Sequence, residues 1–153
     1  MEEKLALAKK LHDEEKFSDA IEILLSLKEL NNAQEKYQLL LLSYSYYRIN
    51  NFTVSYKYAD LLSQKSKSNE FASQIKYLCL VEQNKINEAL SEIINYLNVF
   101  PANLYKVTLE ELLIDVNEGR IYGEFATKIL FFANKNNILN QVKFKPIDKN
   151  RLN

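Results

Sequence analysis

Apolar and polar positions along the chain follow a helical period, and short polar turns interrupt that period at regular intervals. A large apolar residue follows the turn at Phe17, Phe52 and Ile86, positions that recur at a period of about 35 residues. Three positions later a small residue follows in each case, namely Ala20, Ser55 and Ala89. A period of this length indicates a repeat architecture. The pattern predicts helical hairpins at about residues 3–30, 37–65 and 71–100.

The first helix of each predicted hairpin has its own pattern. Two antiparallel helices approach closely only where one offers a small residue to a large one on the other. The first hairpin has Leu7, Ala8 and Leu11, and the second has Leu39, Leu42, Ser43 and Tyr46. Leu7 and Ala8 in the first hairpin correspond to Leu42 and Ser43 in the second. In the third hairpin, Lys76 and Tyr77 stand at these two positions. Either this helix is shifted by about one residue or its repeat is degenerate.

These hairpins resemble tetratricopeptide repeats. The resemblance rests on the polar turn, the small residue after it, the first-helix pattern, and Pro101 at the place of the family's closing proline. It covers about 100 of the 153 residues. It implies an all-α fold, a TPR-like right-handed stack of antiparallel helical hairpins. Stacking would bury the second face of each hairpin, since one hairpin alone has too small a core.

The pattern changes after Pro101. Thr108 to Glu111 has the form of a capping box, which predicts a helix from there to about Asn117, ended by Glu118 and Gly119. A second helix is expected over residues 121–133, with one apolar side made of Ile121, Phe125, Ile129, Leu130 and Phe132. Together these helices form a divergent pair at 108–133.

We therefore expect a helical domain over residues 1–133 and a C-terminal tail over 134–153 that is basic and rich in Asn and Lys. Within this tail, the alternation from Val142 to Pro146 predicts a short extended segment. The tail carries a net charge of +4, from five basic residues and one acidic residue, whereas residues 1–30 carry −3, from five basic and eight acidic residues. These ends could attract each other or neighbouring copies.

The amino-acid composition narrows the fold class and the kinds of partner that we expect. Two Gly and two Pro are too few for a fold rich in turns, which favours helices. The formal charge of zero argues against a nucleic-acid partner, and no apolar run approaches the roughly 20 residues that cross a bilayer. One cysteine, Cys79, and the absence of a signal peptide suit the reducing cytoplasm.

The residues give no indication of catalysis, a cofactor or a metal site. His12 and Cys79 are the only histidine and cysteine, and they are far apart in the sequence. His12 is expected to be exposed near the end of its helix, where it interacts with the last carbonyls, and Cys79 to be a small buried hydrophobe. We expect the protein not to be an enzyme.

The resemblance implies a concave groove lined by the first helices. The groove residues carried over are Leu5, Lys9, His12, Tyr37, Leu40, Tyr44, Tyr47, Arg48, Phe71, Gln74, Leu78 and Glu82. Tyrosine, phenylalanine and arginine are typical of binding hot spots. Of the positions that hold a C-terminal carboxylate in some family members, only Lys9 keeps the required chemistry, so an apolar helix or extended peptide is the expected ligand.

Two functions fit these expectations. The first is a non-catalytic interaction module, an adaptor or an assembly subunit, that binds a partner polypeptide in the aromatic groove. The alternative is a dedicated chaperone for one client or a toxin-neutralising immunity protein. A homodimer stays open as well, because the exposed ends of repeat stacks can associate.

Overall fold

The computed structural model describes residues 2–138, and these residues form eight α-helices and no strand. The helices are α1 (Glu2–Asp13), α2 (Phe17–Ser26), α3 (Asn32–Arg48), α4 (Phe52–Lys65), α5 (Glu70–Glu82), α6 (Ile86–Leu97), α7 (Tyr105–Asn117) and α8 (Gly123–Lys135). The chain divides into two compact units, Met1–Tyr96 and Leu97–Asn153. The all-helical prediction is confirmed for the described residues.

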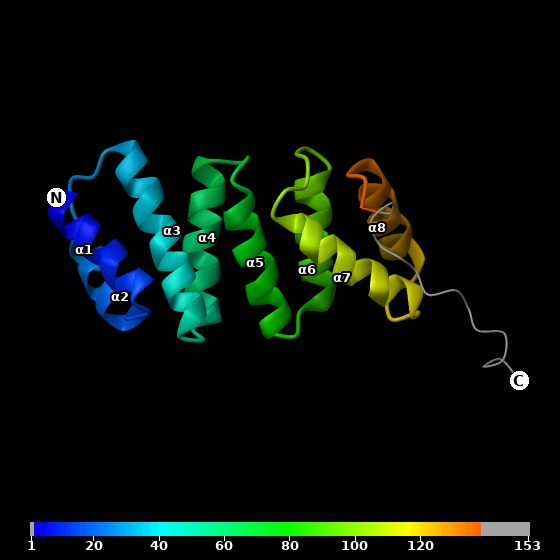
Figure 1. Cartoon of the computed structure of the whole chain (residues 1–153), viewed down its shortest axis with the longest axis horizontal. Helices are drawn as coiled ribbons and strands as arrows, with labels where there is room; N and C mark the ends of the chain where they lie inside the picture. The colour runs from blue at the N-terminus through cyan, green and yellow to red at the C-terminus, as the bar shows by residue number, and fades with distance from the viewer. Residues whose placement is uncertain (1, 139–153) are drawn as a thin grey trace, which may run out of the picture. The chain divides into compact units, whose positions relative to one another are not determined.

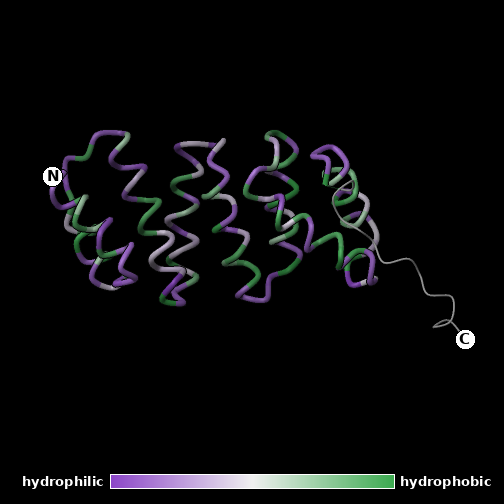
Figure 2. The backbone as a smooth tube through the Cα atoms, in the orientation of Figure 1, coloured by the Kyte–Doolittle hydropathy of each residue, from purple (hydrophilic) through white to green (hydrophobic). Residues whose placement is uncertain are grey.

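In the first unit, successive helices lie beside one another in chain order and reverse direction at each turn (Figure 1). Contacts join α1 to α2, α2 to α3, α3 to α4, and α4 to α5. In addition, α3 contacts both α1 and α5, the next helix but one on either side. Polar and apolar stretches alternate along these helices (Figure 2), as the sequence pattern predicts.

A left-handed residue stands in the turn between the two helices of each pair in this unit, that is, between α1 and α2, α3 and α4, and α5 and α6. The residues are Glu15 (φ 61°), Asn50 (φ 64°) and Asn84 (φ 60°). The next backbone N–H donates to a carbonyl five positions earlier, which is the closure of a Schellman motif. These bonds run from Lys16 N to Leu11 O (2.8 Å), from Asn51 N to Tyr46 O (2.9 Å) and from Lys85 N to Leu80 O (2.8 Å). The first helix of each pair therefore ends in the same way.

Asparagine side chains start three helices of this unit. Asn31 Oδ1 accepts from Gln34 N at 2.8 Å, and Gln34 Oε1 accepts from Asn31 N at 3.0 Å, so the start of α3 has a full capping box. Asn51 caps α4 by accepting from Val54 N. Asn69 caps α5 in the same manner by accepting from Ala72 N.

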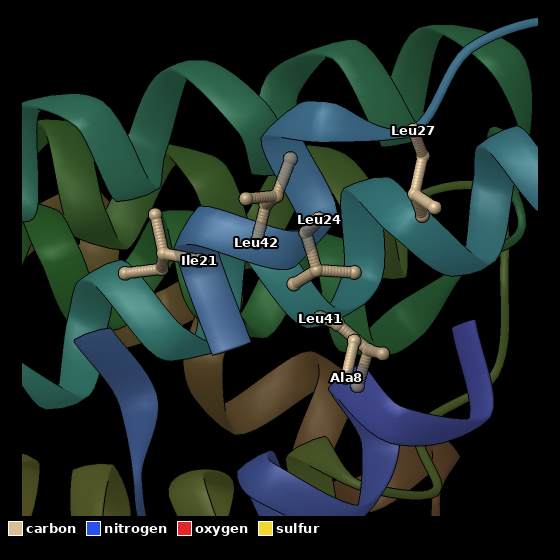
Figure 3. Packing of buried hydrophobic residues seen from close by; sticks show 6 residues of the cluster. All are labelled: Ala8, Ile21, Leu24, Leu27, Leu41 and Leu42. Atoms are coloured by element: carbon tan, nitrogen blue, oxygen red, sulfur yellow. The ribbon is translucent and has the colours of Figure 1, made fainter. Parts of the chain in front are cut away.

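The core of the first pair of helices continues into α3. Figure 3 shows Ala8 of α1 beside Leu41, with Leu24 and Leu42 next to them. The buried residues of this cluster are Ala8, Ile21, Leu24, Leu27, Leu41 and Leu42. Leu7 is 46% exposed, although it stands at the same distance from its turn as the buried Leu42 does. Leu42 packs on α2, the helix before α3.

Small residues occupy buried positions on the second helices of the hairpins. Ala20, Ser55 and Ala89, the repeated small positions, are all buried. The Ser55 hydroxyl donates to Ser43 O at 2.6 Å, and the Cys79 thiol donates to Ser55 Oγ at 3.3 Å. Serine therefore replaces alanine here without leaving its buried hydroxyl unpaired. Cys79 is the buried residue that its position predicts.

The ends of α3 and α5 show which residues of the two helices correspond, and so whether α5 is shifted by one residue. Ile49 N donates to Ser45 O at the end of α3, and Gln83 N donates to Cys79 O at the end of α5. Counted from these equivalent caps, Lys76 corresponds to Leu42. The helix is therefore not shifted, and the third repeat is degenerate at this position.

In the second unit, α7 packs against α8. The expected capping box is wrong, because α7 begins at Tyr105 and Thr108 is buried one turn inside the helix. The predicted end is correct: Gly119 has φ 78°, and Arg120 N donates to Asp115 O at 2.8 Å.

The last helix also differs from its prediction. α8 begins at Gly123 and ends at Lys135, so the expected tail boundary at Asn134 falls inside it. The buried residues of α8 are Ile129, Phe132 and Ala133, whereas Leu130, which was expected on the same side, is exposed. The extended segment expected from Val142 to Pro146 lies outside the described residues.

Replacing Leu24 by Ala should lower the free energy of unfolding by about 2–5 kcal/mol, because the fully buried side chain leaves a cavity. The neighbouring Leu25 is 50% exposed and provides a matched control. Leu25→Ala should change stability by less than about 0.5 kcal/mol. Urea unfolding followed by circular dichroism measures both, and equal losses would contradict this packing.

Candidate functional site

A row of rings joins α1, α3 and α5, the first helices of the three pairs in the first unit. The His12 ring lies 5.0 Å from that of Tyr44, centroid to centroid, and Tyr44 lies 6.1 Å from Phe71. Phe17, at the start of α2, contacts both His12 (5.5 Å) and Tyr44 (5.9 Å) in edge-to-face geometry. Such ring pairs stabilise by about 0.5–1.5 kcal/mol beyond the burial of their area. We call His12, Phe17, Tyr44, Phe71 and Arg48 the ring face.

Arg48 is the cation of the ring face. Its guanidinium carbon lies 4.8 Å from the centroid of the Phe17 ring and 5.7 Å from that of Tyr44. One terminal nitrogen donates to the Tyr44 hydroxyl at 2.8 Å, and the other donates to Glu15 Oε1 at 3.2 Å. These two bonds, Tyr44 first, raise the pKa of Arg48. Glu15 is also the left-handed residue of the first turn.

His12 does not lie where the sequence suggested. It was expected to be exposed and to interact with carbonyls at the end of α1, but its ring is partly buried between Phe17 and Tyr44. Its Nδ1 lies 3.3 Å from Asp13 Oδ1, and its Nε2 is buried with no hydrogen-bond partner among the described residues. The expectation failed because contacts with other helices, not the end of α1, determine its surroundings.

The other predicted groove residues lie on the same three helices, α1, α3 and α5. Leu5, Tyr37 and Leu40 are partly buried against the core of α1 to α3. Lys9 is exposed and pairs with Asp13 at 3.7 Å. Gln74 and Leu78 are partly buried on α5, and Glu82 is exposed at its end.

Tyr47 faces α4. Its ring lies 5.5 Å from Phe52 and packs near Ala59, Ile75 and Cys79. Burial is the main cause that raises the pKa of its phenol, and the nearby Glu82 is the second cause. The structure therefore brings the predicted residues His12, Tyr44, Arg48 and Phe71 together and adds Phe17 and Glu15. The missed residues Phe17 and Glu15 belong to the first turn, and no periodicity within a single helix reveals their proximity to α3.

A second polar group in the first unit is centred on Lys76 of α5, whose side chain is only 12% exposed. Its ammonium lies 3.1 Å from Asp60 Oδ1 on α4 and 3.0 Å from Glu92 Oε1 on α6. It also lies 5.7 Å from the centroid of the Tyr56 ring, while Ser73 donates to Glu92 at 2.8 Å. Burial alone lowers the pKa of Lys76, but its bonds to Glu92 and Asp60 outweigh burial and raise it.

Comparisons of the chain with protein-family models, with curated proteins and with solved structures each gave no match. Among the described residues, no helix is long and apolar enough to cross a membrane. In the same part of the chain, no three His, Cys, Asp or Glu side chains group in a way that could bind a metal ion.

Replacing Tyr44 by Ala should destabilise the first unit by about 1–3 kcal/mol, because the ring contacts His12, Phe17 and Phe71. Tyr44→Phe keeps the ring and removes only the hydroxyl that accepts from the exposed Arg48. It should cost less than about 1 kcal/mol. Urea unfolding compares the two variants, and a large loss for Tyr44→Phe would show that the hydroxyl dominates.

Replacing Lys76 by Met should destabilise the protein by roughly 3 kcal/mol, because Asp60 and Glu92 then face each other without their cation. Lys65→Met removes the exposed pair with Glu35 and should cost less than about 1 kcal/mol. Denaturant unfolding at neutral pH measures both variants.

The contribution of Lys76 should also depend on pH. Because its folded-state pKa is raised, the stabilisation is fully present below the unfolded-state value of about 10.4 and is lost as pH rises through the folded-state pKa. The gap in stability between wild type and Lys76→Met should therefore narrow at high alkaline pH. A gap that stays constant there would contradict the ion pairing.

Proposed function

We propose that the first unit is a TPR-like right-handed stack of helical hairpins, and that it binds a partner polypeptide along its ring face. The evidence for the stack of helical hairpins is the regular recurrence of one turn motif. The left-handed residues Glu15, Asn50 and Asn84 recur at a period of about 35 residues, each with the same closing hydrogen bond. The contacts of α3 with α1 and α5 are those expected when first helices of successive hairpins line one side.

The observation that carries the binding proposal is the row from His12 through Tyr44 to Phe71. These side chains come from three first helices, and all are partly exposed. Aromatic residues supply large contact area at low entropic cost, and arginine adds directed N–H donors. Arg48 is already oriented by Tyr44 and Glu15, so little freedom is lost when it meets a ligand.

The chemistry of the ring face favours an apolar helix or extended peptide that carries an acceptor group for Arg48. Rings and aliphatic surface bury area, and they supply neither a nucleophile nor an activated base. We therefore propose a non-catalytic adaptor or assembly subunit. A reducing cytoplasm suits its free thiol, Cys79, which is buried.

Site-specific photocrosslinking tests the proposal. A benzophenone amino acid at Phe71, on the ring face, should crosslink to a discrete polypeptide in cells, because the partner covers this position. The control carries the same amino acid at Lys57, an exposed position on α4. Mass spectrometry identifies the adducts, and Arg48→Gln should weaken the Phe71 adduct without unfolding the protein. Equal adducts from both positions, or none from Phe71, would count against the ring face.

A further inference from the structure

An apolar strip on α7, in the second unit, faces solvent. Val107 is 61% exposed and Ile114 is 47% exposed. They stand two helical turns apart, which places them on the same side of the helix. Glu111 lies between them on that side and is exposed as well. We call Val107, Glu111 and Ile114 the α7 strip.

The carboxylates near the strip differ in their partners. Asp115 and Glu118 both pair with Arg120. Glu110 and Glu111 have no ion pair among the described residues, although Lys106 lies on the same helix. Over its length α7 has one lysine against Glu110, Glu111 and Asp115, a net charge of −2. An occupant of the strip should therefore be both apolar and basic.

The chain itself continues from a point beside the start of α7. Asn136 follows α8, and its side-chain oxygen accepts from Ala102 N at 2.9 Å. Its side-chain nitrogen donates to Phe132 O at 2.8 Å. Ile138 is fully buried, and Ile138 N donates to Ala133 O at 2.8 Å. The last described residues are thus fixed near Ala102, shortly before α7 begins.

Residues 139–153 have the complementary composition. They contain three Lys and one Arg against one Asp, a net charge of +3. The apolar residues Val142 and Phe144 alternate with Lys143 and Lys145. Fifteen residues can span up to about 50 Å when extended, whereas the thirteen residues of α7 are about 20 Å long. The segment is long enough to reach the whole strip.

We propose that the α7 strip is a docking site for residues 139–153 of the same chain. Apolar side chains of the segment cover Val107 and Ile114, and its lysines pair with Glu110 and Glu111. The covalent connection at Ile138 gives the segment a high effective concentration at the strip, which favours its own chain over a second copy. The strip is distinct from the ring face, and the proposal does not rest on the proposed function.

Paramagnetic relaxation enhancement on the full chain tests this docking. A nitroxide is attached at Lys149→Cys, and the methyl resonances of Ile and Val are recorded. Cys79 is buried and should not react, which a mass spectrum of the wild type treated with the same reagent verifies. The expected result is strong broadening of Val107 and Ile114. The same chain with its nitroxide reduced to the diamagnetic hydroxylamine serves as the control, and its Val107 and Ile114 resonances should keep their intensity.

A charge reversal at Lys143→Glu and Lys145→Glu in the labelled chain should abolish the broadening, and added salt should weaken it. Circular dichroism verifies that the helices persist in this variant. Unchanged Val107 and Ile114 resonances in the labelled parent would overturn the proposal. Broadening that appears only when nitroxide-labelled chains are mixed with separate isotope-labelled chains would overturn it too, because the occupant would then be a second copy.

Discussion

The left-handed turn residue is the constraint on which the hairpins of this protein depend. At Glu15, Asn50, Asn84 and Gly119 the backbone takes positive φ, and the following N–H closes back on the helix that has just ended. The period of about 35 residues extends to Gly119, so the motif also marks the fourth pair, where the rest of the pattern fades. The closure satisfies carbonyls at the helix end and sets the direction in which the chain leaves it.

The residues just after each turn distinguish the regular pairs from the divergent one. In the first unit, the second helix begins two positions after the left-handed residue, and a small buried residue comes three positions later. After Gly119, α8 begins only at Gly123, and the position that corresponds to the small residue holds the exposed Glu124. The same helix ending thus leads to a different pairing, because the close contact that a small residue permits is not available there.

The sequence predicted most of this framework. The turns, the small buried positions and Cys79 can be read from spacing, because each depends on residues near one another in the chain. The predictions that failed depend on contacts with distant parts of the chain or on where a helix begins. Leu7 stands at a position that is buried in the next hairpin but is itself exposed, and Thr108 could cap a helix only if the helix began there. His12 contacts Tyr44 on a different hairpin, and no local pattern encodes that contact.

Lys76 shows how a charged residue at an apolar position of the repeat pattern can be accommodated in the same helical packing. It stands where the preceding repeat has the buried Leu42, and a lone ammonium at such a place would be strongly unfavourable. Asp60 and Glu92 approach it from the helices on both sides, so the position is stabilised by charge in place of apolar contact. The substitution gives up hydrophobic burial for a pairing that needs all three partners, which ties α4, α5 and α6 together.

Glu15 connects the turn to the proposed binding face. A left-handed conformation costs most residues about 1–2 kcal/mol and is easier for glycine or asparagine, which occupy the later turns. A glutamate at this place is therefore unfavourable for the turn alone. Its carboxylate, however, binds Arg48 and helps to orient the guanidinium above Phe17. Asparagine would relax the backbone but could not reach or neutralise Arg48 in the same way. Backbone strain that persists beside an oriented, exposed arginine supports the proposal of a preorganised contact surface there.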